Sequence, residues 1–218
     1  MNVDEGDVVG GFGRAYEAVM VEDVDTPAIR AIAHSTGLTR SNAVTVQVTA
    51  DDGTSWTRVF KGDFSDEVRD CLFTTPNPYG LGVRVRGVMF VVDVSNPENV
   101  VELDVLPLHC VASDIDGNRM FLAGNDEVHA FDGVRIEWTS RRVSLDGIRD
   151  LRYEHGKVHG IATDVGIEAV PFTIDAKTGV ASGGFDGWRL VDGWRLVEDC
   201  RKGWTNKPTP EKRQVQKG

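Results

Sequence analysis

The sequence predicts an all-β, antiparallel fold of about 12 to 16 short strands with only minor helix. Short apolar or alternating runs recur at intervals of roughly 8 to 12 residues. Turn signals separate them, among them Asp132-Gly133 and Asp116-Gly117-Asn118, and such Asp-Gly pairs supply the positive φ angles that tight hairpins need. This spacing favours a propeller-like or β-sandwich arrangement and does not choose between the two.

The expected strands fall into four groups, each able to supply one four-stranded antiparallel unit: residues 10–60, about 70–105, 108–142 and 148–197. In chain order the strands are Ala15–Val21, Ile29–Ala33, Ala43–Thr49, Trp56–Phe60, Leu81–Val85, Val88–Val94, Val100–Val105, Leu108–Ala112, Met120–Ala123, Glu127–Phe131, Val134–Trp138, Ile148–Tyr153, Lys157–Ala162 and Ala169–Ile174. Helix signals are weak, and two segments are candidates for short, minor helices. Pro27 is suited to open one that ends at Ala33, and Ser65 to cap another that ends at Leu72.

One expected hairpin can be assigned faces. With Gly156-Lys157 as a two-residue loop, His155 opposes Val158 and Tyr153 opposes Gly160. Alternation then assigns two faces: a core face of Leu151, Tyr153, Val158 and Ala162, and a solvent face of Arg152, Glu154 and His159.

The formal charge of −10 is unevenly distributed along the chain. Residues 201–218 carry six basic groups and one acidic group, whereas residues 1–200 carry 18 basic and 33 acidic groups. We therefore expect a flexible acidic lead over residues 1–9, a single all-β domain over residues 10–200 and a flexible basic tail over residues 201–218. The all-β domain could also consist of two halves, residues 10–105 and 106–200. A body this negative repels phosphate backbones, which disfavours nucleic-acid binding there.

The composition also predicts a compartment. The first 11 residues have no basic and apolar segments of a signal peptide, and no apolar run approaches the length of a membrane span. Cys71, Cys110 and Cys200 are sparse and lack CxxC spacing. These features favour a reducing cytoplasm.

Two segments share a pattern at the end of a strand. Residues 128–138 read V-x-A-F-D-G-x-x-x-x-W, and residues 172–179 read F-x-x-D-A-x-T-G. They resemble the blade-closing segment of quinoprotein-type β-propellers, where a strand ends in Asp-Ala-x-Thr-Gly before a strand that bears Trp. The first segment lacks Thr-Gly, and no Trp follows Gly179 at the family's position. The resemblance implies a topology and no quinone cofactor, and turn chemistry alone also explains Asp-x-x-Thr-Gly.

Sites for metal ions or phosphate are not expected at the three motifs that suggest them. Gly10-Gly11-Phe12-Gly13 lacks the preceding buried strand and following helix of a phosphate-binding loop, and is interpreted as flexible lead. His155 and His159 cannot converge on zinc from opposite faces of a hairpin. Asp114-Ile115-Asp116-Gly117-Asn118 lacks the later ligands of a calcium loop and predicts a hairpin turn.

No local catalytic signature stands out. His109 and Cys110 are strand neighbours, so their side chains point to opposite faces, and Cys110 is interpreted as a core residue. Ser35 beside His34, and Cys71, have no identifiable partner. Strand-end carboxylates predict turn capping, which applies to Asp114, Asp116, Asp132, Asp146, Asp164 and Asp175. We predict no catalytic, cofactor-binding or metal-ligating residues.

The C-terminal region is rich in tryptophan and arginine. These side chains are common at the energetic centres of interfaces, so the predicted partner-binding residues are Trp188, Arg189, Trp194, Arg195 and Trp204. For Trp188 and Trp194 core packing is the favoured alternative, whereas Trp204 is expected to be exposed. Residues 186–191 and 192–197 are identical copies of Asp-Gly-Trp-Arg-Leu-Val, either a hairpin or a tandem duplication, with the duplication favoured.

The sequence does not state a function, and two hypotheses remain. The first is a non-catalytic, acidic, cytoplasmic module that binds another protein with a basic surface, as an immunity-type or adaptor protein does. The second is a hydrolase or carbohydrate-acting enzyme whose site is built from loop carboxylates. Neither requires a cofactor or a membrane, and the oligomeric state is left open.

Overall fold

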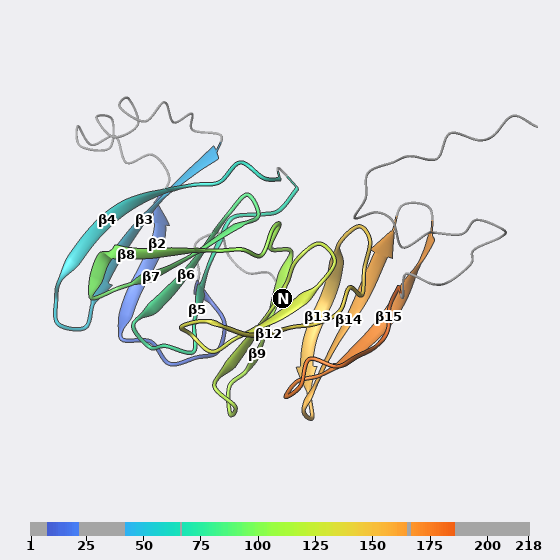
Figure 1. Ribbon diagram of the computed structural model, residues 1–218. Coiled ribbons are helices and arrows are strands. Elements are labelled where there is room, and N and C mark those ends of the chain that lie inside the picture. Colours follow the sequence, from blue (N-terminus) through green and yellow to red (C-terminus); the bar gives the residue numbers. More distant parts are fainter. Residues whose placement is uncertain (1–7, 22–41, 66, 165–166, 186–218) are drawn as a thin grey trace, which may run out of the picture. The chain divides into compact units, whose positions relative to one another are not determined.

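Four sheets, numbered here in chain order, contain the described strands of this computed structural model (Figure 1). The structure describes residues 8–21, 42–65, 67–164 and 167–185, which lie in the compact unit Met1–Phe185. The predicted strand Ile29–Ala33, the helix opened by Pro27 and the whole region beyond Phe185 lie outside the described residues.

Sheet 1 has the order β2-β3-β4, with β2 (Tyr16–Val21), β3 (Ala43–Ala50) and β4 (Ser55–Lys61). Sheet 2 has the order β1-β5-β6-β7-β8, with β1 (Val8–Val9), β5 (Cys71–Thr74), β6 (Gly80–Val85), β7 (Val88–Asp93) and β8 (Asn96–Leu103). Among the described strands, only the short β1 pairs in parallel, with β5.

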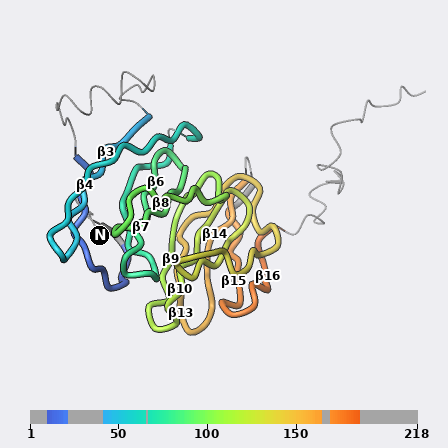
Figure 2. The backbone as a smooth tube through the Cα atoms, turned by 60° about the vertical axis from the view of Figure 1, so that its left-hand side comes forward, coloured from blue at the N-terminus to red at the C-terminus, as the bar shows by residue number. Residues whose placement is uncertain are grey.

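Sheet 3 has the order β12-β11-β10-β9, with β9 (Cys110–Asp114), β10 (Arg119–Ala123), β11 (Val128–Phe131) and β12 (Ile136–Thr139). Sheet 4 has the order β13-β14-β15-β16, with β13 (Ile148–Glu154), β14 (Lys157–Asp164), β15 (Ile167–Asp175) and β16 (Ala181–Gly183). The colours of Figure 2 follow this progression from sheet to sheet.

The predicted all-β class is confirmed, and the arrangement is propeller-like. Apart from β1, which joins sheet 2, each sheet is built from strands that are consecutive in the chain, and three hydrophobic clusters lie between successive sheets. Tyr16 and Leu72 belong to the cluster between sheets 1 and 2, Met89 and Met120 to that between sheets 2 and 3, and Phe121 and Phe172 to that between sheets 3 and 4. The four predicted groups therefore correspond to the four sheets, but the predicted number of four strands holds only for sheets 3 and 4, because sheet 1 has three strands and sheet 2 has five.

Three segments differ from their expectations. The predicted helix from Ser65 to Leu72 is instead a turn followed by the start of β5. Leu72 packs toward sheet 1 and Phe73 toward sheet 3, and a strand buried on both faces has no alternation to reveal it. At the end of the expected flexible lead, Val8–Val9 form β1, and Phe12 is buried with its N–H on Thr74 Oγ1 (3.2 Å). The three-residue β16 was not expected.

The register of the β13–β14 hairpin differs by one residue from the prediction, while its faces are confirmed. Glu154 pairs with Lys157 and Tyr153 with Val158, so the loop is His155-Gly156, with φ angles of 50° and 77°. Leu151 and Tyr153 pack on the core with Val158 and Ala162, whereas Arg152 pairs with His159 on the other face.

Two strand glycines make room for aromatic rings. Gly82 pairs with Phe73, and Gly160 pairs with Phe172. A Cβ atom on Gly82 would lie 2.0 Å from the Phe73 ring, and one on Gly160 would lie 2.4 Å from the Phe172 ring. The rings thus lie across the neighbouring strand and replace the side chain that glycine lacks.

Candidate binding surface

The hairpin that joins the last two strands of each sheet is closed by an aspartate. Asp52 Oδ1 accepts a hydrogen bond from the Thr54 N–H (2.8 Å), and Asp93 Oδ1 accepts one from the Ser95 N–H (2.9 Å). Asp132 Oδ1 accepts two, from Val134 and Arg135 (both 2.8 Å), and Asp175 Oδ1 accepts from Lys177 N (3.2 Å) and Thr178 N (2.9 Å). These four residues mark one equivalent position in all four sheets.

Two indole rings close the seams between neighbouring sheets. Trp56, in sheet 1, donates its Nε1–H to the carbonyl of Val94, the residue after Asp93 in sheet 2 (3.0 Å). Trp138, in sheet 3, donates in the same way to the carbonyl of Ala176, the residue after Asp175 in sheet 4 (3.2 Å). The sequence segments that share the strand-end pattern are therefore in contact, because Trp138 of the first lies against the D-A-x-T-G turn of the second.

The seam between sheets 2 and 3 has a valine in place of the indole. Trp138 pairs with Ala130, two residues before Asp132, and Val101 pairs with Val91, two residues before Asp93. Val101 is 49% exposed. Val101 thus has in sheet 2 the register position that Trp138 has in sheet 3. Its side chain is much smaller than an indole and is exposed to solvent.

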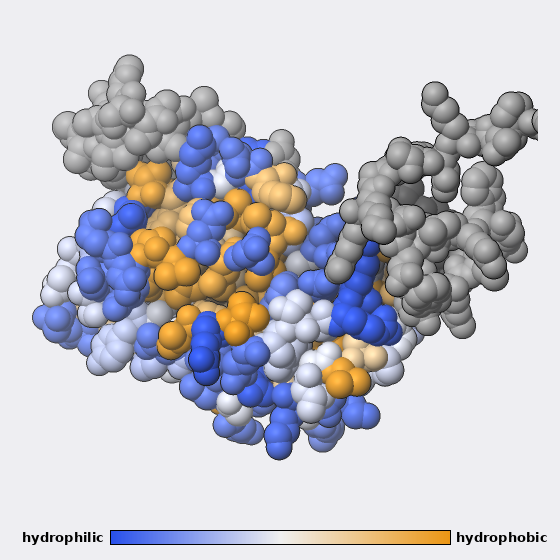
Figure 3. Space-filling model, in the orientation of Figure 1, coloured by the Kyte–Doolittle hydropathy of each residue, from blue (hydrophilic) through white to orange (hydrophobic). Residues whose placement is uncertain are grey.

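Further apolar side chains lie on the two sheets that border this seam. Val91 and Ile136 are partly buried against the cluster between sheets 2 and 3, and Val134 is 78% exposed in the β11–β12 turn. Figure 3 shows hydrophobic residues gathered on the face around β7 and β8. We call the set Val91, Val101, Val134 and Ile136 the open seam.

The strands that flank the open seam are strongly acidic. Residues 96–104 and 126–139 contain seven carboxylates and one guanidinium group. Three of these carboxylates pair with arginines from outside the two segments: Glu98 with Arg58 (3.7 Å), Glu137 with Arg119 (2.5 Å) and Asp126 with Arg142 (3.0 Å). Counting those three arginines, the flanks still carry seven negative and four positive groups.

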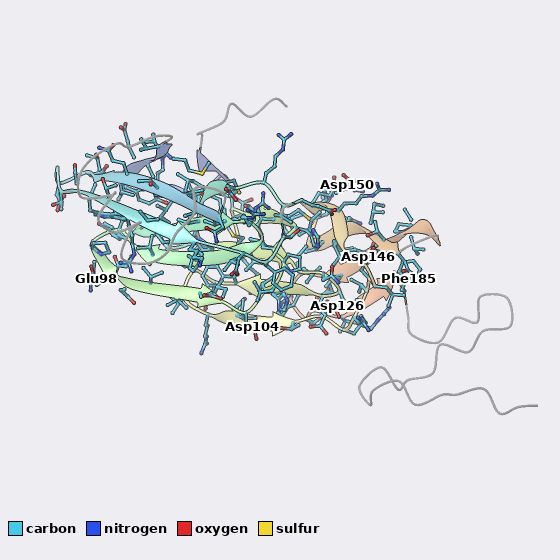
Figure 4. All side chains as sticks on the ribbon, turned by 90° about the horizontal axis from the view of Figure 1, so that it is seen from above. Glu98, Asp104, Asp126, Asp146, Asp150 and Phe185 are labelled. Carbon is cyan, nitrogen blue, oxygen red and sulfur yellow. The ribbon has the colours of Figure 1, made fainter. Side chains whose placement is uncertain are left out.

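A histidine lies among these groups. Burial lowers the pKa of His129, and the carboxylates of Asp126 and Asp104 oppose that shift. Asp104 and Asp126 are labelled in Figure 4. On the histidine ring, Nδ1 lies 3.0 Å from Thr139 Oγ1. At neutral pH the imidazole is uncharged, so it does not offset the acidity of the flanks.

The residues considered for nucleophilic catalysis make structural contacts. His109 Nε2 lies 3.4 Å from Asn125 Oδ1, whereas Cys110 Sγ donates to the carbonyl of Ile148 (3.5 Å), so the two neighbours have separate partners. Burial raises the pKa of the Cys110 and Cys71 thiols, which disfavours the reactive thiolate. Ser35, His34 and Cys200 lie outside the described residues.

One buried serine was not singled out from the sequence. Ser144 Oγ donates to the carbonyl of Gly147 and accepts from the N–H of Thr163 (3.1 Å). It ties the connection after β12 to β14, and its lack of exposure excludes it from a surface site. An isolated serine in a loop gives no sequence signal for this role.

The motifs considered for metal binding are turn and strand residues. Asp114 is a hairpin residue as predicted, with its Oδ1 accepting from the Gly117 N–H (2.9 Å). His155 lies in a turn, and His159 Nδ1 lies 3.2 Å from Thr173 Oγ1. Within residues 8–21, 42–65, 67–164 and 167–185, no three His, Cys, Asp or Glu side chains are grouped to hold a metal ion.

The predicted partner-binding residues Trp188, Arg189, Trp194, Arg195 and Trp204 all lie outside the described residues, so the structure does not place them. The open seam was not found from the sequence. In the part of the chain that is described, no helix is long and apolar enough to span a membrane.

Comparison with known proteins gives distant structural similarity only. No protein-family model and no curated protein matches the sequence. The chain is similar to the crystal structure of puromycin hydrolase, with 13% identity, a TM-score of 0.45, and coverage of 82% of this chain and 28% of that one. It is also similar to a chain of the nidogen/laminin complex (9% identity, TM-score 0.38, 66% and 60% coverage) and to apo AztD from Citrobacter koseri (11%, 0.40, 68% and 49%). These proteins are of the β-propeller type, and this chain spans between about a quarter and three fifths of their lengths.

Proposed function

We propose that this chain is a non-catalytic module that binds another protein through an acidic surface, and that its partner presents basic residues. The observation that carries this proposal is the open seam, where exposed valines are flanked by seven carboxylates and four guanidinium groups, the three paired arginines included. Apolar side chains at the centre with charges around them are the usual anatomy of a protein interface. The hydrogen bonds of His109, Cys110 and Ser144 support a structural role for these groups.

The charge of the whole described region supports the same partner chemistry. Its 22 acidic and 14 basic residues give a net charge of −8, so the field around it attracts basic surfaces from a distance. The free thiols of Cys71 and Cys110 are consistent with our proposal that the protein works in the cytoplasm.

Native mass spectrometry of the protein purified from its own host tests this function. We expect a stoichiometric protein partner, whose association rate falls markedly between low and physiological salt because exposed charges are screened. A bound small molecule without a protein partner would support the alternative, a hydrolase or carbohydrate-acting enzyme with a site of loop carboxylates. An association rate that is indifferent to salt would contradict the electrostatic part of the proposal.

A further inference from the structure

We propose that the open seam receives an aromatic side chain, best an indole, from a basic segment of the partner protein. The inference rests on the proposed function and specifies how the partner is recognised. It follows from comparing the three seams between the described sheets, two of which are closed by an indole of the chain itself.

The first step is the equivalence of position. Val101 and Trp138 lie on the last strand of their sheets, and each pairs with the residue two places before the hairpin aspartate. Each side chain also lies on the face of its sheet that is turned toward the next sheet. Val101 shares a face with its cross-strand partner Val91, which packs in the cluster between sheets 2 and 3, and Trp138 packs in the cluster between sheets 3 and 4. Trp56 differs, since it pairs with Val48, four places before Asp52. A side chain entering over Val101 would therefore stand at the register position that Trp138 has in sheet 3.

The second step concerns the hydrogen-bond acceptor. In the two closed seams the indole N–H bonds to the carbonyl of the residue after the hairpin aspartate, which is Val94 or Ala176. The corresponding residue in the open seam is Gly133, which follows Asp132 and is buried. Within the described part of the chain, no group donates a hydrogen bond to the Gly133 carbonyl. Gly133 has a φ angle of 95° and lies against Pro76 and Asn77. A donor from outside the chain would add a hydrogen bond at its carbonyl.

The third step is the charge of the occupant. The acidic flanks disfavour a neutral or acidic segment and favour lysine or arginine on either side of the inserted ring. Trp and Arg are also the side chains that contribute most at interface centres. The open seam thus fits a segment in which a tryptophan stands among basic residues.

Two synthetic peptides test the proposal on the full chain. One places a single tryptophan between lysine and arginine residues, and the other has alanine in its place, so the two have equal charge. Methyl NMR of the wild-type protein should show saturable shifts at Val101 and Ile136 with the tryptophan peptide. The alanine peptide should bind about tenfold more weakly or worse, because it retains only the electrostatic attraction.

Matched variants locate the contact. Val101→Trp should close the seam with an indole of the chain, as in the other two seams, and should abolish binding of the tryptophan peptide. Val19→Trp is the control, because Val19 is equally exposed (48%) and lies in sheet 1, opposite in alternation to the core residue Ala18. It should bind the peptide like the wild type.

Equal binding of the two peptides, methyl shifts centred away from the open seam, or unchanged binding by Val101→Trp would each overturn the proposal. Should Val101→Trp fail to fold, the methyl shifts of the wild type decide alone. If the host partner binds wild type and Val101→Trp equally, the seam proposal fails while the binding function stands. If the host protein has no protein partner at all, the proposed function itself fails.

Discussion

The two indole seams should differ in their sensitivity to the same substitution. Trp56→Phe and Trp138→Phe each remove one N–H donor and keep most of the aromatic surface. The carbonyl that Trp138 contacts, that of Ala176, also accepts from Arg119 Nη1 at 3.1 Å. The carbonyl of Val94 has Trp56 as its one donor among the described residues, and Val94 is 1% exposed.

The magnitudes follow from these partners. Trp138→Phe loses one hydrogen bond from a carbonyl that keeps another, which should lower the free energy of unfolding by about 0.5–1.5 kcal/mol. Trp56→Phe leaves the buried Val94 carbonyl without any donor. This should lower the free energy of unfolding by about 1–3 kcal/mol, in addition to the small loss of packing. For a chain of this size, each kcal/mol corresponds to about 2–4 °C in melting temperature.

Urea unfolding followed by circular dichroism measures both variants. A double-mutant cycle adds the control: in an Arg119→Gln background, Trp138→Phe should become as costly as Trp56→Phe, because the Ala176 carbonyl then loses both donors. If Trp138→Phe is the more damaging single substitution, or if the cycle is additive, the donor-counting explanation of the seams is wrong.

Three further predictions address packing and pH. Gly82→Ala should destabilise the fold by about 1–3 kcal/mol in urea unfolding, because its Cβ meets the Phe73 ring, whereas Gly13→Ala, with no atom within 4 Å, should be neutral. Burial lowers the pKa of His129 in the folded protein, so the free energy of unfolding should fall as the pH drops below about 6.5. Between about pH 7.5 and 5.5 this fall should be smaller in His129→Gln than in the wild type. An equal fall in the two proteins would contradict the prediction. Hydrogen bonds from Thr178 lower the pKa of Asp175, so Asp175→Ala should lower the melting temperature at neutral pH, and the deficit should vanish as acid protonates the wild-type carboxylate. A deficit independent of pH would show that the charge does not matter.

The sequence by itself determined the fold class and most of the strands, because both depend on local signals. Alternation set the faces of β13 and β14, and glycine-containing turn signals marked the hairpins, even at His155-Gly156, where the loop differs by one residue from the prediction. The turn-capping roles of Asp132 and Asp175 were likewise readable, since an aspartate bonds to N–H groups only two or three residues away.

Only the tertiary structure decided the strand β5 and the open seam. β5 is buried on both faces, so its apolar residues carry no period that separates strand from helix. The seam depends on which residue of each last strand meets the neighbouring sheet. The pairing register shifts between Ala130 and Phe131 in sheet 3, and between Val92 and Asp93 in sheet 2. Trp138 and Val101 are therefore separated from their hairpin aspartates by different numbers of residues in the sequence. Equivalent positions in space then lose equivalent spacing in the chain, and no sequence pattern links them.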